Sequence, residues 1–239
     1  GRFKIAKTYT IVIGKEATDV TYLKLGSDYN KKLVPEPSFR AINTYPKNND
    51  TLVSATQSIA FYLNSPVDTA SISANFTSTP HVNGRWTTSV YDRFYLDFRP
   101  DPNFKSNIWY EFSFSTGLKD TFGNHLQSPF SMRFKTFPFQ VTTTYPNNGN
   151  QNVYTNELIS CYFSYNIDTS TIRNAFRLIP QTNGYLDYSY SYPTSYFSFN
   201  PAGSLLQNTN YTVTISTSLR SINGDTLYSP YSFSFKTVP

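Results

Sequence analysis

The sequence predicts an all-β protein made of tandem seven-stranded β-sandwiches, and three observations lead to this prediction. Aromatic residues make up 18% of the 239 residues and charged residues only 15%, a mixture that favours strands and turns over helices. Apolar and polar side chains alternate in short runs such as the one containing Val213 and Ile215, which is the period of a half-buried strand. Finally, most of the chain repeats itself after about 100 residues.

The repeat divides the chain into domains. Residues 44–46 match residues 144–146, and the match continues to residues 134–136 and 235–237, with one extra residue in the second copy. Each copy of about 95 residues holds roughly seven strand-like runs separated by turn signals, as in a two-sheet sandwich. We therefore expect one domain over residues 44–138 and a second over residues 139–239, joined by a short, stiff junction without a Gly- or Ser-rich run.

Each copy also contains recognisable local elements. Alternation in an early strand predicts an inner face, formed by Ile59, Phe61 and Leu63 in the first copy and by Ile159, Cys161 and Phe163 in the second. Further along, Asp68 and Asp168 are placed to cap a single helical turn.

The later part of each copy contains residues that are typical of turns. Asn83 with Gly84, repeated 100 residues later, predicts a type I′ hairpin turn. Gly123 and Gly224 indicate the turn before each last strand.

A tyrosine opens one strand near the end of each copy. Tyr110 and Tyr211 each follow a large apolar residue by six positions and begin an alternating run, a pattern that resembles the tyrosine corner of immunoglobulin and fibronectin-type sandwiches. Tyr9 opens the same pattern near the start of the chain. We therefore interpret residues 1–43 as the C-terminal part of an upstream repeat followed by a linker.

Both copies resemble the bacterial Ig-like domains found in S-layer and other large surface or secreted proteins. The resemblance rests on the Thr-Tyr-Pro opening, the Asp-Thr turn, the strand after Tyr211 and the closing Phe-x-Phe-Lys-Thr, and it covers residues 44 to 239. It implies tandem Ig-like (fibronectin-like) sandwiches outside the bacterial cytoplasm. The family has no shared catalytic residues, so the resemblance transfers none.

Composition excludes several classes of protein. The net charge is +5, but the twenty Lys and Arg residues are scattered, which argues against nucleic-acid binding. The chain has one cysteine and so no internal disulfide. No run approaches the roughly 18 apolar residues of a membrane span, and we expect any export signal or anchor to lie outside this chain.

The sequence shows no pattern typical of catalysis or of cofactor binding. His81 and His125 lack partners at metal-ligand spacing and are interpreted as surface residues. Cys161 takes the place of the core residue Phe61 and is interpreted as buried. Asp120 and the residues after it place several oxygens in one turn, as a calcium site does, but the second copy lacks this carboxylate, so a plain turn is the better interpretation. We expect no enzyme activity, metal or cofactor.

One run of tyrosines is a candidate for ligand or interface contact. Alternation places Tyr188, Tyr190 and Tyr192 on one face of a strand, where a row of rings could stack on sugars or anchor a protein interface. The alternative is that these rings cover the sandwich or the neighbouring copy.

Three functional hypotheses remain open. The first is a non-catalytic structural and adhesive module of a larger bacterial surface or secreted protein, with neighbouring Ig-like domains as its partners. The second is a carbohydrate-binding module that recognises a surface glycan or cell-wall polymer through the tyrosine row. The third is edge-to-edge packing of the chain into a filament or lattice, because sandwiches leave strand edges that need covering.

Overall fold

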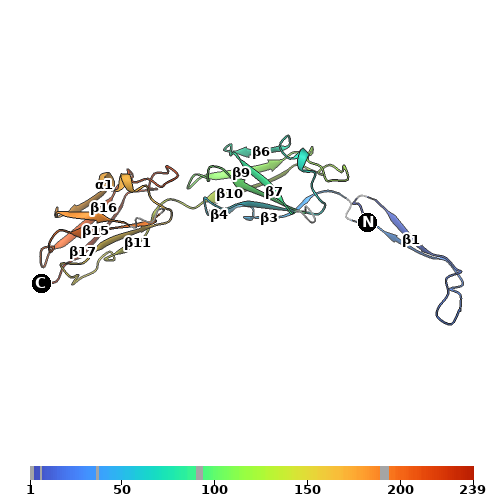
Figure 1. Ribbon diagram of the computed structural model, residues 1–239, viewed down its shortest axis with the longest axis horizontal. Helices are drawn as coiled ribbons and strands as arrows, with labels where there is room; N and C mark the ends of the chain where they lie inside the picture. The colour runs from blue at the N-terminus through green and yellow to red at the C-terminus, as the bar shows by residue number, and fades with distance from the viewer. Residues whose placement is uncertain (1–2, 6, 36–37, 90–93, 189–193) are drawn as a thin grey trace. The chain divides into compact units, whose positions relative to one another are not determined.

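The computed structural model (Figure 1) describes residues 3–5, 7–35, 38–89, 94–188 and 194–239. The described residues form strands with three short helical turns, which confirms the predicted all-β class. The chain divides into two compact units, one of residues 1–50, 57–101 and 109–134 and the other of residues 51–56, 102–108 and 135–239. Each unit contains most of the core of one repeat.

The first repeat is a sandwich of two four-stranded sheets, with a 3-10 turn η1 over Thr69–Ser71. One sheet has the order β3 (Ala41–Tyr45), β5 (Ile59–Leu63), β8 (Tyr95–Pro100) and β7 (Gly84–Thr88). The other has the order β4 (Asp50–Val53), β10 (Phe130–Thr136), β9 (Trp109–Phe114) and β6 (Phe76–Thr79).

The second repeat has the same plan with seven strands. Its first sheet has the order β11 (Val141–Tyr145), β12 (Ile159–Phe163), β15 (Tyr196–Pro201) and β14 (Gly184–Asp187). Its second sheet has the order β13 (Phe176–Ile179), β16 (Asn210–Ile215) and β17 (Tyr231–Lys236). Two short turns, η2 (Thr169–Thr171) and α1 (Ile172–Ala175), connect the sheets. The equivalent of β4 is reduced to a single bridge between Val153 and Thr237.

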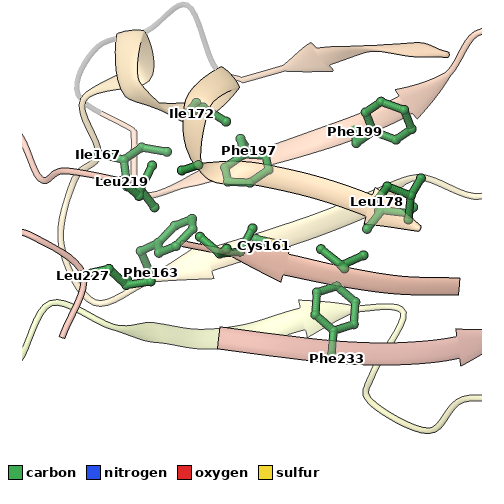
Figure 2. Packing of buried hydrophobic residues seen from close by; sticks show 14 of the residues in the cluster. Cys161, Phe163, Ile167, Ile172, Leu178, Phe197, Phe199, Leu219, Leu227 and Phe233 are labelled. Atoms are coloured by element: carbon green, nitrogen blue, oxygen red, sulfur yellow. The ribbon is translucent and has the colours of Figure 1, made fainter. Parts of the chain in front are cut away.

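The core lies between the two sheets of each repeat and follows the predicted alternation. The predicted inner-face residues of β5 and β12 are all buried. In Figure 2 the side chains of Cys161, Phe163, Phe197, Leu178 and Phe233 all lie between the layers. Burial of each large apolar side chain contributes roughly 1.5–3 kcal/mol, so a core of this kind stabilises each repeat without a disulfide or metal.

The predicted aspartate caps and glycine turns are confirmed. The Asp68 carboxylate accepts a hydrogen bond from the backbone N–H of Ala70 at 3.1 Å, and Asp168 accepts one from Ser170 at 3.0 Å. Gly123 has φ +84° and Gly224 has φ +76°, conformations in which a residue with Cβ is strained.

The predicted type I′ hairpin turn at Asn83 and Gly84 is wrong. Neither residue has the positive φ that this turn requires. β6 pairs with β9 in one sheet while β7 pairs with β8 in the other, so the connection crosses between sheets. Glycine is needed at position 84 for a different reason: a Cβ there would lie 2.4 Å from the backbone oxygen of Arg99.

The predicted tyrosine corner is confirmed at Tyr211. Its side chain is 1% exposed, and its Oη accepts a hydrogen bond from the backbone N–H of Leu206 at 2.9 Å. Tyr110 is buried at the matching position and stacks on Phe134 at 5.7 Å, as Tyr211 stacks on Phe235 at 5.6 Å. The upstream hydrogen bond of Tyr110 stays a prediction.

The N-terminal segment forms a separate two-stranded antiparallel sheet, β1 (Tyr9–Ile13) with β2 (Tyr29–Leu33). Burial does not alternate along these strands as it does along β16, because the apolar side chains Ile11, Val12, Ile13 and Tyr29 are all exposed. The assignment of residues 1–43 to an upstream repeat stays a prediction.

Candidate functional site

The predicted tyrosine row begins at the end of strand β14. Tyr188 is half-buried and packs against the core of its own repeat, together with Leu186. Tyr190 and Tyr192 lie outside the described residues, so a role of the row in binding stays a prediction. Tyr188 thus faces the inner side of the sandwich, while its neighbour Tyr185 is exposed and its hydroxyl accepts a hydrogen bond from Asn200.

A cleft of about 610 Å³ lies beside the same strand, on the open side of the second sandwich. It is bounded by β13, an edge of one sheet, and by β14, an edge of the other. This volume is within the range of small-ligand sites, roughly 300–1,000 Å³. The residues that line it form an apolar floor and a polar rim. The floor contains Phe176, Leu178, Leu186 and Phe199, and the rim contains Arg173, Asn174, Arg177, Gln181 and Thr182.

The cleft is associated with a difference in side-chain volume between the repeats. Trp86 stands in the first repeat where Leu186 stands in the second. The Trp86 ring lies 4.8 Å from the ring of Phe76 and 4.9 Å from that of Phe98, and so fills the equivalent space. The smaller Cys161, in place of Phe61, removes further volume from the second core.

The rim of the cleft carries two positive charges. Arg173 and Arg177 are exposed, and neither has an ion-pair partner among the described residues. The first repeat has Ser73 and Thr77 at these positions. The cleft can therefore donate hydrogen bonds from guanidinium and amide groups to an anionic or hydroxyl-rich ligand resting on an apolar floor.

Sequence reasoning missed this cleft, although its signals are visible in the alignment of the two repeats. Replacement of Trp86 by Leu186 removes volume, and replacement of Ser73 and Thr77 by arginines adds charge near the same strand edge. The sequence alone does not show that these substitutions lie around one cleft, because β13 and β14 belong to different sheets and do not pair with each other.

The two histidines lie on the surface, and the one cysteine lies in the core. His81 and His125 are exposed, as predicted; a ring nitrogen of His81 lies 3.2 Å from Asn83 Oδ1 and one of His125 lies 3.1 Å from Thr116 O. Cys161 is 0% exposed, as predicted, and burial raises the pKa of its thiol to about 12, so the nucleophilic thiolate does not form near neutral pH. Within the described ranges, no group of three His, Cys, Asp or Glu residues could hold a metal ion.

In the oxygen-rich turn before the last strand, the Asp120 carboxylate accepts hydrogen bonds from the turn's own backbone and from neighbouring side chains. Asp120 is 1% exposed, and its Oδ1 accepts hydrogen bonds from the backbone N–H groups of Phe122 at 2.9 Å and Asn124 at 2.8 Å. Its Oδ2 accepts from the Ser65 hydroxyl at 2.7 Å and from the Asn124 amide at 2.8 Å. Protein donors thus already surround both oxygens, which supports the plain-turn interpretation over a calcium site.

The solved structures to which this chain is similar include two kinds of protein. The N-terminal part of the bacterial S-layer protein SbsC is 12% identical, with a TM-score of 0.34, and the match covers 83% of this chain and 44% of that one. The L,D-transpeptidase LdtMt1 in complex with imipenem is 16% identical, with a TM-score of 0.32, and the match covers 42% of this chain and 40% of that one. This chain spans between 40% and 45% of the length of the first transpeptidases it matches. Likenesses of this size carry no inference about activity.

No curated protein matches the sequence. None of the described helices has the length and apolarity needed to cross a membrane.

The two sandwiches, their repeated turns and the tyrosine corner define a tandem Ig-like β-sandwich protein. The family model for the bacterial Ig-like domain matches residues 35–136 and 137–237, and the chain belongs to this family. Domains of this family are in general non-catalytic.

Proposed function

We propose that this chain is a non-catalytic structural module of a larger bacterial cell-surface or secreted protein, in which tandem Ig-like repeats act as a stiff spacer or assembly unit. The observation that carries the proposal is that each repeat has a complete apolar core between its own two sheets. The polar side chains most suited to catalysis or metal binding are buried in turns or lie singly in exposed loops. The partners of such a module are neighbouring Ig-like domains.

The spacer role can be tested by measuring the distance between the repeats in solution. Spin labels at Lys47→Cys and Asn147→Cys mark equivalent exposed positions, and the buried Cys161 remains unlabelled in the folded chain. A stiff spacer gives one narrow distance distribution in pulsed electron paramagnetic resonance.

The control is the same double variant with a flexible Gly-Ser insertion of about six residues after Pro138. The insertion should broaden the distribution. A distribution that is equally broad without the insertion would contradict the spacer proposal.

The cleft beside β14 favours a second candidate, which is carbohydrate recognition. Guanidinium and amide donors above an apolar floor are the groups that bind hydroxyl-rich or anionic polymers. Glycan and cell-wall polymer arrays would compare the intact chain with Leu186→Trp, which fills the cleft with the residue of the first repeat, and with Arg173→Ala/Arg177→Ala. The matched control is Lys47→Ala, which removes an exposed charge from the other repeat.

Binding that is lost in the cleft variants and kept in the control would support this second function. A Tyr190→Ser/Tyr192→Ser variant separates the cleft from the predicted tyrosine row. Absence of binding by the intact chain would leave the structural module as the proposal.

A further inference from the structure

The N-terminal hairpin has the same strand register as the last two strands of the second repeat. Residues 3–34 align without a gap with residues 205–236. In the hairpin, Tyr9 pairs with Leu33 and Ile13 with Tyr29. In the second repeat the equivalent pairs are Tyr211 with Phe235 and Ile215 with Tyr231. All five cross-strand pairs correspond.

The tyrosine corner is also present in the hairpin. The Oη of Tyr9 accepts a hydrogen bond from the backbone N–H of Lys4 at 2.9 Å, five residues upstream. Tyr211 accepts one from Leu206 at 2.9 Å, again five residues upstream. The ring of Tyr9 packs against that of Phe3 at 4.7 Å, and Phe3 aligns with the buried Leu205.

The connection between the two strands is the third point of agreement. An isolated bridge joins Thr18 to Lys24, as bridges join Lys119 to His125 and Arg220 to Thr226 at the equivalent positions. Within this turn, Asp19 Oδ1 accepts hydrogen bonds from the backbone N–H groups of Thr21 at 2.7 Å and Leu23 at 3.0 Å. Asp120 accepts from the matching residues of the first repeat in the same way.

Burial is where the hairpin and the repeats differ. Ile11 and Ile13 are each 44% exposed, whereas the matching Val213 and Ile215 are each 0% exposed. In the second repeat, the opposite sheet covers this face and β13 pairs with the free edge of β16. The hairpin has neither cover among the described residues, and a two-stranded sheet alone is marginally stable in water.

We infer that residues 3–34 are the last two strands of a third Ig-like sandwich, whose uncovered face binds the preceding strands of that sandwich. These strands would be equivalent to residues 139–204 and are supplied by the same polypeptide ahead of Phe3. The second repeat shows this chain order, because β15 ends at Pro201, shortly before Leu205. The inference concerns how the hairpin folds and does not depend on the proposed spacer role.

Lys31 is the one charged residue on the face to be covered, where the second repeat has Phe233. Its aliphatic stem can cover apolar neighbours while the ammonium reaches the rim of the sandwich. The opposite face carries Val12 together with Thr10, Asn30 and Lys32, so it resembles the solvent face of a sheet.

The test adds strands equivalent to the proposed preceding ones directly ahead of the hairpin. Residues 139–204 are joined directly ahead of Phe3, and amide hydrogen exchange of β1 and β2 is compared with that of residues 1–239 alone. We expect exchange to slow by at least about 100-fold, because opening the hairpin must then disrupt a packed domain. Exchange in β1 and β2 that stays as fast as in the parent chain, with residues 139–204 unprotected, would overturn the inference.

Two variants of the joined chain separate the two faces of the hairpin. Ile11→Asp places a charge on the face to be covered and should abolish the protection. Val12→Asp places the same charge on the opposite face, where the side chain is 57% exposed, and should leave the protection in place. Equal effects of the two variants would count against an ordered sandwich.

A reciprocal graft tests the inference independently, in case residues 139–204 pack poorly on the hairpin in the joined chain. Residues 205–236 of the second repeat are replaced by residues 3–34, and folding is followed by hydrogen exchange of β12 and β15. Protection of these strands supports the inference even if the joined chain does not fold, whereas failure of both chains refutes it. A concentration-dependent dimer of residues 1–239 with protected β1 and β2 would instead assign the face to a second copy and overturn the proposed occupant.

Discussion

Asp120 and Asp225 lie at opposite ends of the same five-residue turn in the two repeats, and each is the buried carboxylate of its turn. Ser221 stands in the second repeat where Asp120 stands in the first, and Asn124 stands where Asp225 does. The Ser221 hydroxyl accepts hydrogen bonds from the N–H groups of Asn223 and Asp225 and lies 3.1 Å from Asp225 Oδ2. The carboxylate has thus changed position while the backbone hydrogen bonds of the turn are kept.

Asp120→Ala should destabilise the first repeat by about 2–4 kcal/mol, because it leaves the buried Ser65 hydroxyl and two partly buried backbone N–H groups without an acceptor. Urea unfolding followed by tryptophan fluorescence measures this repeat alone, since Trp86 and Trp109 are the two tryptophans of the chain. Asp120→Ser/Asn124→Asp, which copies the second repeat, should be more stable than Asp120→Ser. If the double variant is no more stable than Asp120→Ser, a carboxylate at position 124 does not replace the one at position 120.

Tyr211→Phe should lower the free energy of unfolding of the second repeat by about 1 kcal/mol, because the Leu206 N–H loses its acceptor while the ring still packs. Cys161 is the one cysteine of the chain and is buried in this repeat, so its alkylation in urea reports unfolding of the second repeat alone. Tyr154→Phe is the control, because this tyrosine is exposed. If Tyr211→Phe and the parent chain have the same urea midpoint, the hydrogen bond of the tyrosine corner does not stabilise the repeat.

Cys161 should also give the second repeat a dependence on alkaline pH. Burial raises the pKa of the thiol from 9.0 to about 12, so the folded state holds its proton more tightly than the unfolded state. This contribution to stability is fully present below pH 9 and is lost as the pH rises from 9 towards about 12. Relative to Cys161→Ala, the parent chain should lose about 2 kcal/mol between pH 8 and pH 10.5.

Urea unfolding followed by circular dichroism at the two pH values measures the difference. The tyrosines and lysines titrate in both chains, so subtracting the alanine variant isolates the thiol. In the folded parent chain at pH 8, Cys161 should resist thiol reagents. Rapid labelling without denaturant, or parallel pH profiles for the two chains, would show that the thiol is more accessible than its position implies.

The sequence predicted those features that depend on a repeated local period. The buried positions of Ile159, Cys161 and Phe163 followed from alternation, and the corner at Tyr211 followed from the spacing to Leu205. The turn at Asn83 was predicted wrongly because a turn signal is local, whereas strand pairing is decided by the whole fold. The cleft was not predicted, because its walls come from two strands that belong to different sheets.

Gly184 is a second position where strand pairing, and not a local turn signal, explains the residue, and it leads to a last prediction. A Cβ at this position would lie 2.4 Å from the Phe199 ring and 2.5 Å from the backbone oxygen of Asn200, a strand neighbour that cannot move away without breaking the pairing of β14 with β15. Gly184→Ala should therefore destabilise the second repeat by about 2 kcal/mol or more, measured by Cys161 alkylation in urea. Gly203→Ala is the matched control: a Cβ there meets nothing within 4 Å, and the change should be neutral or stabilise by up to about 1 kcal/mol through the unfolded chain. If the two variants unfold at the same urea concentration, the close approach of β15 is not what requires glycine at position 184.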